Sequence, residues 1–193
     1  LVIQNSYVDV TGGHVQKDGG EVAVDGRFTT RFPRPDRAEE MNARIRVTNW
    51  TASDFKHAFN IDEYAVVGSI DSEEHIYGPY HGPFGFGTLT INRGVAYGEP
   101  FESATGSLRF EGNGVRIDGI EMKKSGGTGE GAAFVGWNGT YSFNADGRRI
   151  PMDSVHAVTY PGLPLTGLMD FSSDGSGTFD VPRYQFRAQI HDL

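Results

Sequence analysis

An acidic and histidine-containing cluster is the first group of residues in this chain that suggests chemistry. Glu73, Glu74, His75 and His81 lie close together in the sequence, and carboxylates and imidazoles are common zinc ligands. They fall in a passage rich in glycine and proline, without the spacing that fixes ligands on a helix or on a pair of strands. We therefore predict that this cluster holds no metal.

Other short motifs resemble functional sequences only in composition. Residues 170–175 lack the closing Glu of a calcium-binding loop, and residues 126–131 lack the Lys-Ser/Thr pair of a phosphate-binding loop. No serine stands in a Gly-x-Ser-x-Gly context, and the sequence does not place Asp153 relative to Asp170 as a glycosidase pair. We predict that the chain is not an enzyme and that it uses no cofactor.

The overall composition favours a β-sheet protein. Of 193 residues, 27 are glycine and 37% are apolar, a combination typical of many short strands and turns. The formal net charge of −8 disfavours nucleic acid as a partner, because the two would repel each other. The absence of cysteine excludes disulfides, cysteine-ligated zinc and thiol catalysis. No apolar run is long enough to cross a membrane as a helix.

Alternating apolar and polar residues predict about a dozen strands separated by turns. Gly12 and Gly13 are expected to form a turn, and the Gly-Asn-Gly at 112–114 predicts a hairpin in which Asn113-Gly114 adopts positive φ angles. Residues 31–40 contain two prolines among charged side chains, so we expect an exposed loop there.

One short helix is predicted in the first half of the chain. Phe55, Ala58 and Phe59 follow the i, i+3, i+4 spacing of a helix face, and Ser53-Asp54 supplies a candidate N-cap just before them.

An internal repeat favours an elongated sheet over a closed sandwich or barrel. Residues 43–91 align with residues 142–190 at an offset of 99, which matches Asp54 with Asp153 and His57 with His156. The two histidines therefore hold equivalent positions, which favours a structural or surface role. Repeats that stack edge to edge build a quasi-one-dimensional sheet.

A second alignment, of residues 1–13 with 115–127, matches Gly12-Gly13 with Gly126-Gly127. We infer one segment over residues 1–193 that holds a little under two repeats of about a hundred residues, approximately 1–114 and 115–193. Because both ends look strand-like, we expect the chain to be a fragment of a larger protein.

The passage from residue 87 to residue 155 resembles the AsmA-like superfamily, in particular its TamB-type repeats. The resemblance rests on the sequence of residues 87–143, GTLTINRGVAYGEPFESATGSLRFEGNGVRIDGIEMKKSGGTGEGAAFVGWNGTYSF, which is followed by a short amphipathic helix. Residues 43–70 look like a second copy of the helix unit. The resemblance implies a curled β-groove, or β-taco, with an apolar concave face and without metal, cofactor or catalytic residue.

The resemblance also implies a location and a function. Members of this kind are anchored in the inner membrane and cross the periplasm of the bacterial cell envelope, so membrane contact would lie outside this chain. We expect a segment that conducts phospholipid between inner and outer membranes and contacts the acyl chains. The alternatives are a scaffold or chaperone for outer-membrane β-barrel proteins and, less favoured, a carbohydrate-binding β-solenoid. The last would show a stripe of exposed aromatic residues, and Trp50 and Trp137 fall in different phases of the repeat.

The predicted groove lining consists of the apolar residues at inward positions of the predicted strands. From the sequence they equally suit a sealed core, because periodicity shows which residues share a face but not whether that face is open. They are Val22, Val24, Ile45, Val47, Leu89, Ile91, Leu108, Phe110, Ile117, Ile120, Phe134, Phe143, Leu168, Phe179, Phe186 and Ile190.

Overall fold

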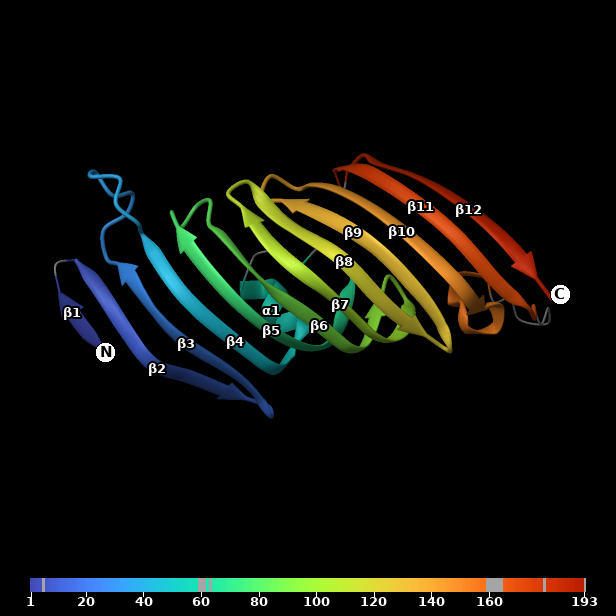
Figure 1. Cartoon of the computed structure of the whole chain (residues 1–193), viewed down its shortest axis with the longest axis horizontal. Coiled ribbons are helices and arrows are strands. Elements are labelled where there is room, and N and C mark those ends of the chain that lie inside the picture. Colours follow the sequence, from blue (N-terminus) through green and yellow to red (C-terminus); the bar gives the residue numbers. More distant parts are fainter. Residues whose placement is uncertain (5, 59–61, 63, 159–164, 179, 193) are drawn as a thin grey trace.

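A single antiparallel sheet makes up almost all of the structure (Figure 1). The computed structural model describes residues 1–4, 6–58, 62, 64–158, 165–178 and 180–192. Within these residues, twelve strands pair in the order in which they occur in the chain. The prediction of an all-β, elongated antiparallel sheet with short helices is confirmed.

All strands except β1 have 10 to 13 residues, and the helical segments follow the fourth and tenth strands. The strands are β1 (Val2–Gln4), β2 (Tyr7–Lys17), β3 (Gly20–Thr29), β4 (Met41–Thr51), β5 (Val66–Gly78), β6 (Phe84–Ala96), β7 (Glu99–Glu111), β8 (Gly114–Lys124), β9 (Gly127–Gly136), β10 (Thr140–Pro151), β11 (Leu168–Thr178) and β12 (Pro182–His191). The helical segments are α1 (Ala52–Ala58) and the 3₁₀ turns η1 (Met152–Ser154) and η2 (His156–Val158).

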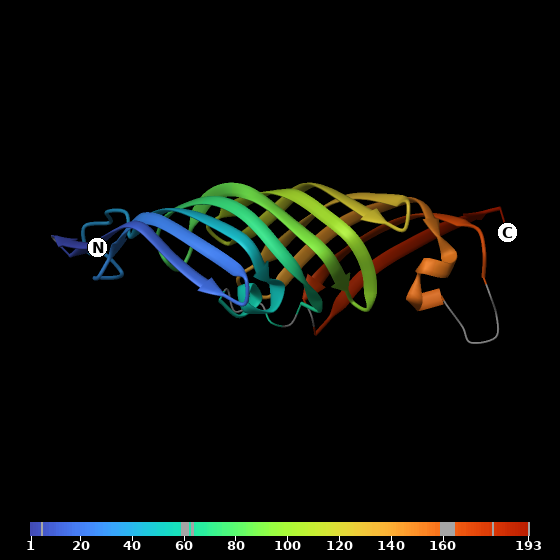
Figure 2. The same ribbon diagram turned by 90° about the horizontal axis from the view of Figure 1, so that it is seen from below.

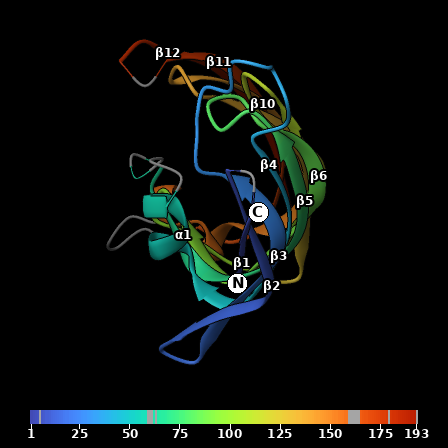
Figure 3. The same cartoon turned by 90° about the vertical axis from the view of Figure 1, so that its left-hand side faces the viewer.

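The sheet is curled into an open trough. Viewed from its end, the sheet forms a curve with α1 on the inner side (Figure 3), and viewed from below the strands arch over that side (Figure 2). We call the inner side the concave face and the outer side the polar face. Successive connections alternate between the two long rims. The helix rim carries α1, η1 and η2, and the loop rim carries residues 30–40.

The period-two alternation of the strands places apolar side chains on the concave face. Val22 pairs with Val47 across β3 and β4, and Ile70 pairs with Ile91 across β5 and β6. Phe55 of α1 packs against the cluster around Val47 and Ile70, which places that cluster on the inner side. Burial of these side chains is the main force that stabilises the sheet.

A β-bulge recurs at equivalent places along the sheet. At Gly12, Asn49 and Arg149 the chain adopts positive φ angles where the strand register shifts. Each of these main-chain N–H groups donates to an aspartate on the next strand, for example Asn49 N to Asp71 Oδ1 at 2.9 Å. Bulges of this kind bend and twist a strand, so the repeated bulge contributes to the curl of the trough.

The repeat at an offset of 99 matches the elements of the structure. The series β4, α1, β5 and β6 corresponds to β10, η1–η2, β11 and β12. Asp71 and Asp170, which the alignment matches, make the same hydrogen bond to a bulge, and His57 and His156 fall in the corresponding helical connections. The aligned part of the repeat therefore contains three strands and one helical connection, and one full period runs from β4 to β9.

The second alignment, of residues 1–13 with 115–127, does not match the structure. Gly12 lies at a bulge within β2, whereas Gly126 lies in the turn between β8 and β9. The structural counterpart of Gly12 is Gly119, which is also at a bulge with a positive φ angle. The predicted turn at Gly12-Gly13 is therefore wrong, because a glycine pair also permits a bulge inside a strand.

Two local predictions hold in outline and differ in detail. The hairpin between β7 and β8 is present, but Gly112 rather than Asn113 or Gly114 adopts the positive φ angle. The helix α1 is present, but the Asp54 N–H donates a hydrogen bond to Thr51 Oγ1, so the capping side chain comes from the end of β4.

Candidate binding trough

Most of the predicted lining residues do lie on the concave face. The strand pairing places thirteen of them there, from Val22 on β3 to Ile190 on β12, in one face shared by ten strands. These thirteen are Val22, Val24, Ile45, Val47, Leu89, Ile91, Leu108, Phe110, Ile117, Ile120, Phe143, Phe186 and Ile190. Phe179 lies outside the described residues.

Phe134 and Leu168 lie on the other face. In β9 the concave positions are taken by Gly131, Ala133 and Val135, because Ala133 pairs with Ile117 and Val135 with Val115. Phe134 points to the polar face, where the Arg116 guanidinium lies 5.3 Å from its ring centroid. Leu168 is next to Met169, which belongs to a concave-face cluster. Because neighbouring residues of a strand point to opposite faces, Leu168 lies on the polar face.

The concave face is only partly covered. Its buried side chains form three separate clusters rather than one continuous core, and Val24, Leu89 and Ile117 between them keep intermediate exposure. Among the described residues no second sheet packs on this face, and α1, η1 and η2 cover only the helix rim. The face is an open apolar trough that spans about 43 Å across its ten strands, at about 4.8 Å for each of the nine strand spacings.

Glu74 is an ionisable residue on this largely apolar surface. It lies on β5 between Ile45 of β4 and Gly87 of β6, and only 4% of its surface is exposed. Neither carboxylate oxygen makes a hydrogen bond of good geometry within the described structure. Burial raises the pKa of Glu74 to about 7, although the neighbouring Ser72 hydroxyl acts in the opposite direction. The sequence pattern placed this residue in a passage rich in glycine and proline rather than on a strand, so its burial was not predicted.

The cluster of Glu73, Glu74, His75 and His81 is divided by the strand. Glu73 and His75 point to the polar face, where Glu73 pairs with Arg46 at 2.6 Å and His75 contacts Asn42 at 2.9 Å. His81 lies in the turn that follows β5. Among the described residues no three acidic or histidine side chains converge on a point where a metal ion would sit.

An ion pair fastens η2 to the helix rim. Glu99 accepts hydrogen bonds from the main-chain N–H groups of His156 at 3.1 Å and Ala157 at 2.7 Å. The Lys124 ammonium, which is buried, lies 3.1 Å from the same carboxylate. Burial alone would raise the pKa of Glu99, but these three donors outweigh it and hold the pKa below its ordinary value. The earlier helix is held similarly, by Lys17 and Asp54 at 2.8 Å.

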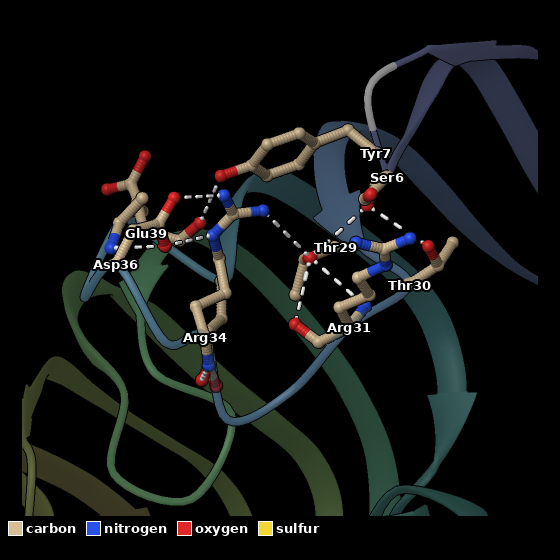
Figure 4. Close-up of polar contacts among 10 residues, drawn as sticks. Ser6, Tyr7, Thr29, Thr30, Arg31, Arg34, Asp36 and Glu39 are labelled. Carbon is tan, nitrogen blue, oxygen red and sulfur yellow. Dashed lines mark hydrogen bonds and ion pairs between the residues drawn. The ribbon is translucent and has the colours of Figure 1, made fainter.

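The loop rim has its own anchored segment, residues 30–40 (Figure 4). Arg34 pairs with Asp36, and its guanidinium lies 4.7 Å from the Tyr7 ring centroid. Glu40 is buried and accepts hydrogen bonds from Arg34 N at 3.0 Å and Tyr80 N at 2.8 Å. The predicted loop is present, but it is tied to the sheet rather than fully exposed.

The polar face carries two shallow hollows and an aromatic patch. A hollow of about 580 Å³ lies among Arg44, Arg46, His75 and Phe86, and a second of about 530 Å³ lies over β10, β11 and β12. The two hollows lie over strands that correspond in the repeat, since β10 to β12 correspond to β4 to β6. Exposed aromatic rings at Tyr77, Phe84 and Phe86 contact one another or His75, and the sequence analysis missed this patch because its members come from two strands.

The fold and the trough define the protein as an open, curled β-sheet with one apolar face. None of the helices in the described residues is long and apolar enough to cross a membrane. Comparison of the chain with protein-family models, with curated proteins and with solved structures finds no significant match.

Proposed function

We propose that the chain is a segment of an AsmA-like, TamB-type β-groove protein that conducts phospholipid between the inner and outer membranes of a bacterial envelope. The observation that supports this function is the apolar concave face, which is shared by successive strands and left open to an elongated ligand. An acyl chain in the trough would gain about 0.8 kcal/mol for each buried CH₂ group. A lining without fixed polar contacts suits a ligand that moves along it.

An empty trough would expose its apolar lining to water, which is unfavourable in free energy. Exposed apolar patches of this extent on soluble proteins mark binding surfaces. The polar face, in contrast, carries ion pairs such as Arg46 with Glu73 and Arg109 with Asp118. Acyl chains would therefore occupy the concave face and water would cover the polar face.

The first test is lipid extraction and mass spectrometry of the purified protein, with two variants of adjacent residues. Leu89→Lys places a charge in the trough, and Thr88→Lys places the same charge on the polar face of the same strand. We expect phospholipid to co-purify with the wild type and Thr88→Lys and to be lost from Leu89→Lys, with unchanged circular dichroism. Absence of lipid from all three folded proteins, or equal loss from both variants, would contradict the proposal.

Strand addition to unfolded outer-membrane proteins is a second candidate function, favoured by β12. In the described structure this strand pairs only with β11, and Tyr184 and Phe186 on it are 71% and 55% exposed. An unpaired strand edge is a template for β-augmentation. Binding of a peptide from a barrel strand, measured in the absence of lipid, separates this function from lipid conduction.

A further inference from the structure

Burial of the Glu74 carboxyl group carries a free-energy cost, and in the described structure the Ser72 hydroxyl is the neighbouring group that reduces it. Burial of a carboxyl group without a hydrogen-bond partner is unfavourable, and burial of its charged form is far more so. Ile45, Ile76 and Leu108 occupy concave positions around it on three strands. The side chain therefore lies among apolar groups at the floor of the trough.

The internal repeat indicates that the fold itself does not need this carboxyl group. At the offset of 99, Glu74 corresponds to Ser173 on β11. Ser173 also occupies a concave position, since it pairs with Ala145 of β10 and Phe186 of β12. The equivalent position in the second repeat thus accepts a neutral side chain. The fold therefore does not require a carboxyl group at Glu74, and we look for its role in binding.

No neighbouring charge compensates for ionisation of Glu74. The charged and titratable side chains of the adjoining strands, namely Arg44 and Arg46 on β4, Glu73 and His75 on β5, and Arg109 on β7, all alternate to the polar face. On the concave side, Lys56 and His57 of α1 have their own partners in Tyr64 O and Asp62. Within the described structure no charged group faces the Glu74 carboxyl.

An ionised Glu74 must therefore be solvated by water, and because its side chain lies on the concave face this water would enter from the open side of the trough. The other side of the residue is the hydrogen-bonded main chain of β4, β5 and β6. The space that this water would fill is the floor of the trough, where an acyl chain would otherwise lie. Water and acyl chain thus compete for one place.

We infer that Glu74 makes occupation of the trough by an acyl chain depend on proton concentration: the neutral acid permits it and the carboxylate opposes it. This inference rests on the proposed function and specifies how the same surface is regulated. An acyl chain over Glu74 removes the last route for water and so favours the neutral form. The protein with a bound acyl chain therefore keeps the Glu74 proton at a pH at which the free protein has lost it. By linkage, the affinity for the acyl chain falls as the pH rises.

The test is the affinity of the protein for pyrene-labelled phosphatidylcholine as a function of pH. The head group of this probe keeps its charge over the range used, from about pH 5.5 to about pH 8.5. Above about pH 7 we expect the wild-type affinity to fall, by at most about tenfold per pH unit, because one proton is linked to binding. Glu74→Gln should bind the probe with the same affinity at every pH.

Glu73→Gln is the matched control, because it removes the adjacent carboxylate on the polar face. It should keep the pH dependence of the wild type. A flat wild-type profile, or a pH dependence that persists in Glu74→Gln, would overturn the inference while leaving the trough as a lipid site. Failure of all three folded proteins to bind the probe at any pH would overturn the proposed function and the inference with it.

Discussion

Gly87 is the residue that makes room for Glu74. A Cβ atom at Gly87 would lie 2.3 Å from Glu73 O and 2.9 Å from Glu74 Cγ. Both distances are below any normal contact, so the position admits only glycine unless the strands shift. A glycine in a strand interior marks a close approach of this kind.

We expect Gly87→Ala to lower the free energy of unfolding by about 1–3 kcal/mol, the usual cost of overpacking. Thr88→Ala, at the next residue on the polar face, should change it by less than about 0.5 kcal/mol. Urea denaturation measures both. Equal stability of the two variants would mean that β5 and β6 move apart at little cost.

The raised pKa of Glu74 also predicts how stability depends on pH. The folded protein holds a proton that the unfolded chain loses near the ordinary glutamate pKa of 4.5. The cost of ionising the buried group is therefore absent below about pH 4.5, grows as the pH rises to about 7, and is complete above it. We expect Glu74→Gln to be more stable than the wild type at pH 8 by about 3 kcal/mol.

Below about pH 4.5 this advantage should disappear, because both side chains are then neutral. Thermal or urea denaturation at several pH values measures the difference. A constant difference between the two proteins across this range would show that Glu74 does not change its protonation within it.

At the scale of elements, the recurring bulge is the feature that shapes the sheet. Asp71 accepts hydrogen bonds from the bulge N–H of Asn49 at 2.9 Å and from Asn92 Nδ2 at 2.8 Å. It thereby ties β4, β5 and β6 together at the point where the register shifts. Asp25 and Asp170 make the corresponding main-chain bond elsewhere in the sheet.

Asp71→Ala should lower the free energy of unfolding by about 1–3 kcal/mol, because both donors lose a charged acceptor. Asp71→Asn keeps one carbonyl oxygen at the bulge and should lose less. Chemical denaturation of the two variants tests this ranking. If Asn proved as damaging as Ala, the charge rather than the hydrogen bond would be the stabilising feature.

The attachment of η2 to the helix rim depends on Glu99. In Glu99→Gln the Lys124 ammonium stays buried without its counter-ion, which typically costs about 3 kcal/mol. Because the pKa of Glu99 is lowered in the folded state, the wild-type advantage is present at neutral pH and disappears as the pH falls through that pKa.

Hydrogen exchange of the amides of His156 and Ala157 reports on this attachment directly. We expect faster exchange at both positions in Glu99→Gln at neutral pH, and a much smaller difference in acid. Unchanged protection would mean that packing of Met152 and Val155 holds the segment by itself.

At the scale of the whole molecule, the described sheet ends in strands that have only one partner, β1 and β12. β6 and β12 are equivalent in the repeat, yet β6 pairs with β5 and β7 whereas β12 pairs only with β11. All ten residues of β12 are exposed. Hydrogen bonding on one side only leaves a strand free to separate from the sheet.

We expect the amides of β12 to exchange with solvent at least about tenfold faster than those of β6, as local opening of an edge strand requires less free energy. Hydrogen exchange followed by mass spectrometry compares the two strands in one experiment. Equal protection of the two strands would show that another strand covers β12 in solution. If the protection of β12 also rose with protein concentration, that strand would belong to a second copy of the chain.

Much of this architecture was predictable from the sequence, because its causes are local. Period-two alternation marked the strands, and the spacing of Phe55 and Ala58 marked α1. The match of Asp71 with Asp170 indicated a repeat whose elements the structure contains. An open sheet in sequential strand order needs only neighbouring contacts, so local patterns contain most of the information.

The tertiary structure alone decided which of its two faces each strand turns towards the trough. Pairing with β8 and β10 sends Phe134 to the polar face, and pairing of β5 with β4 and β6 buries Glu74. Alternation within one strand shows which residues share a face. Only the neighbouring strands determine whether that face is apolar, concave and open.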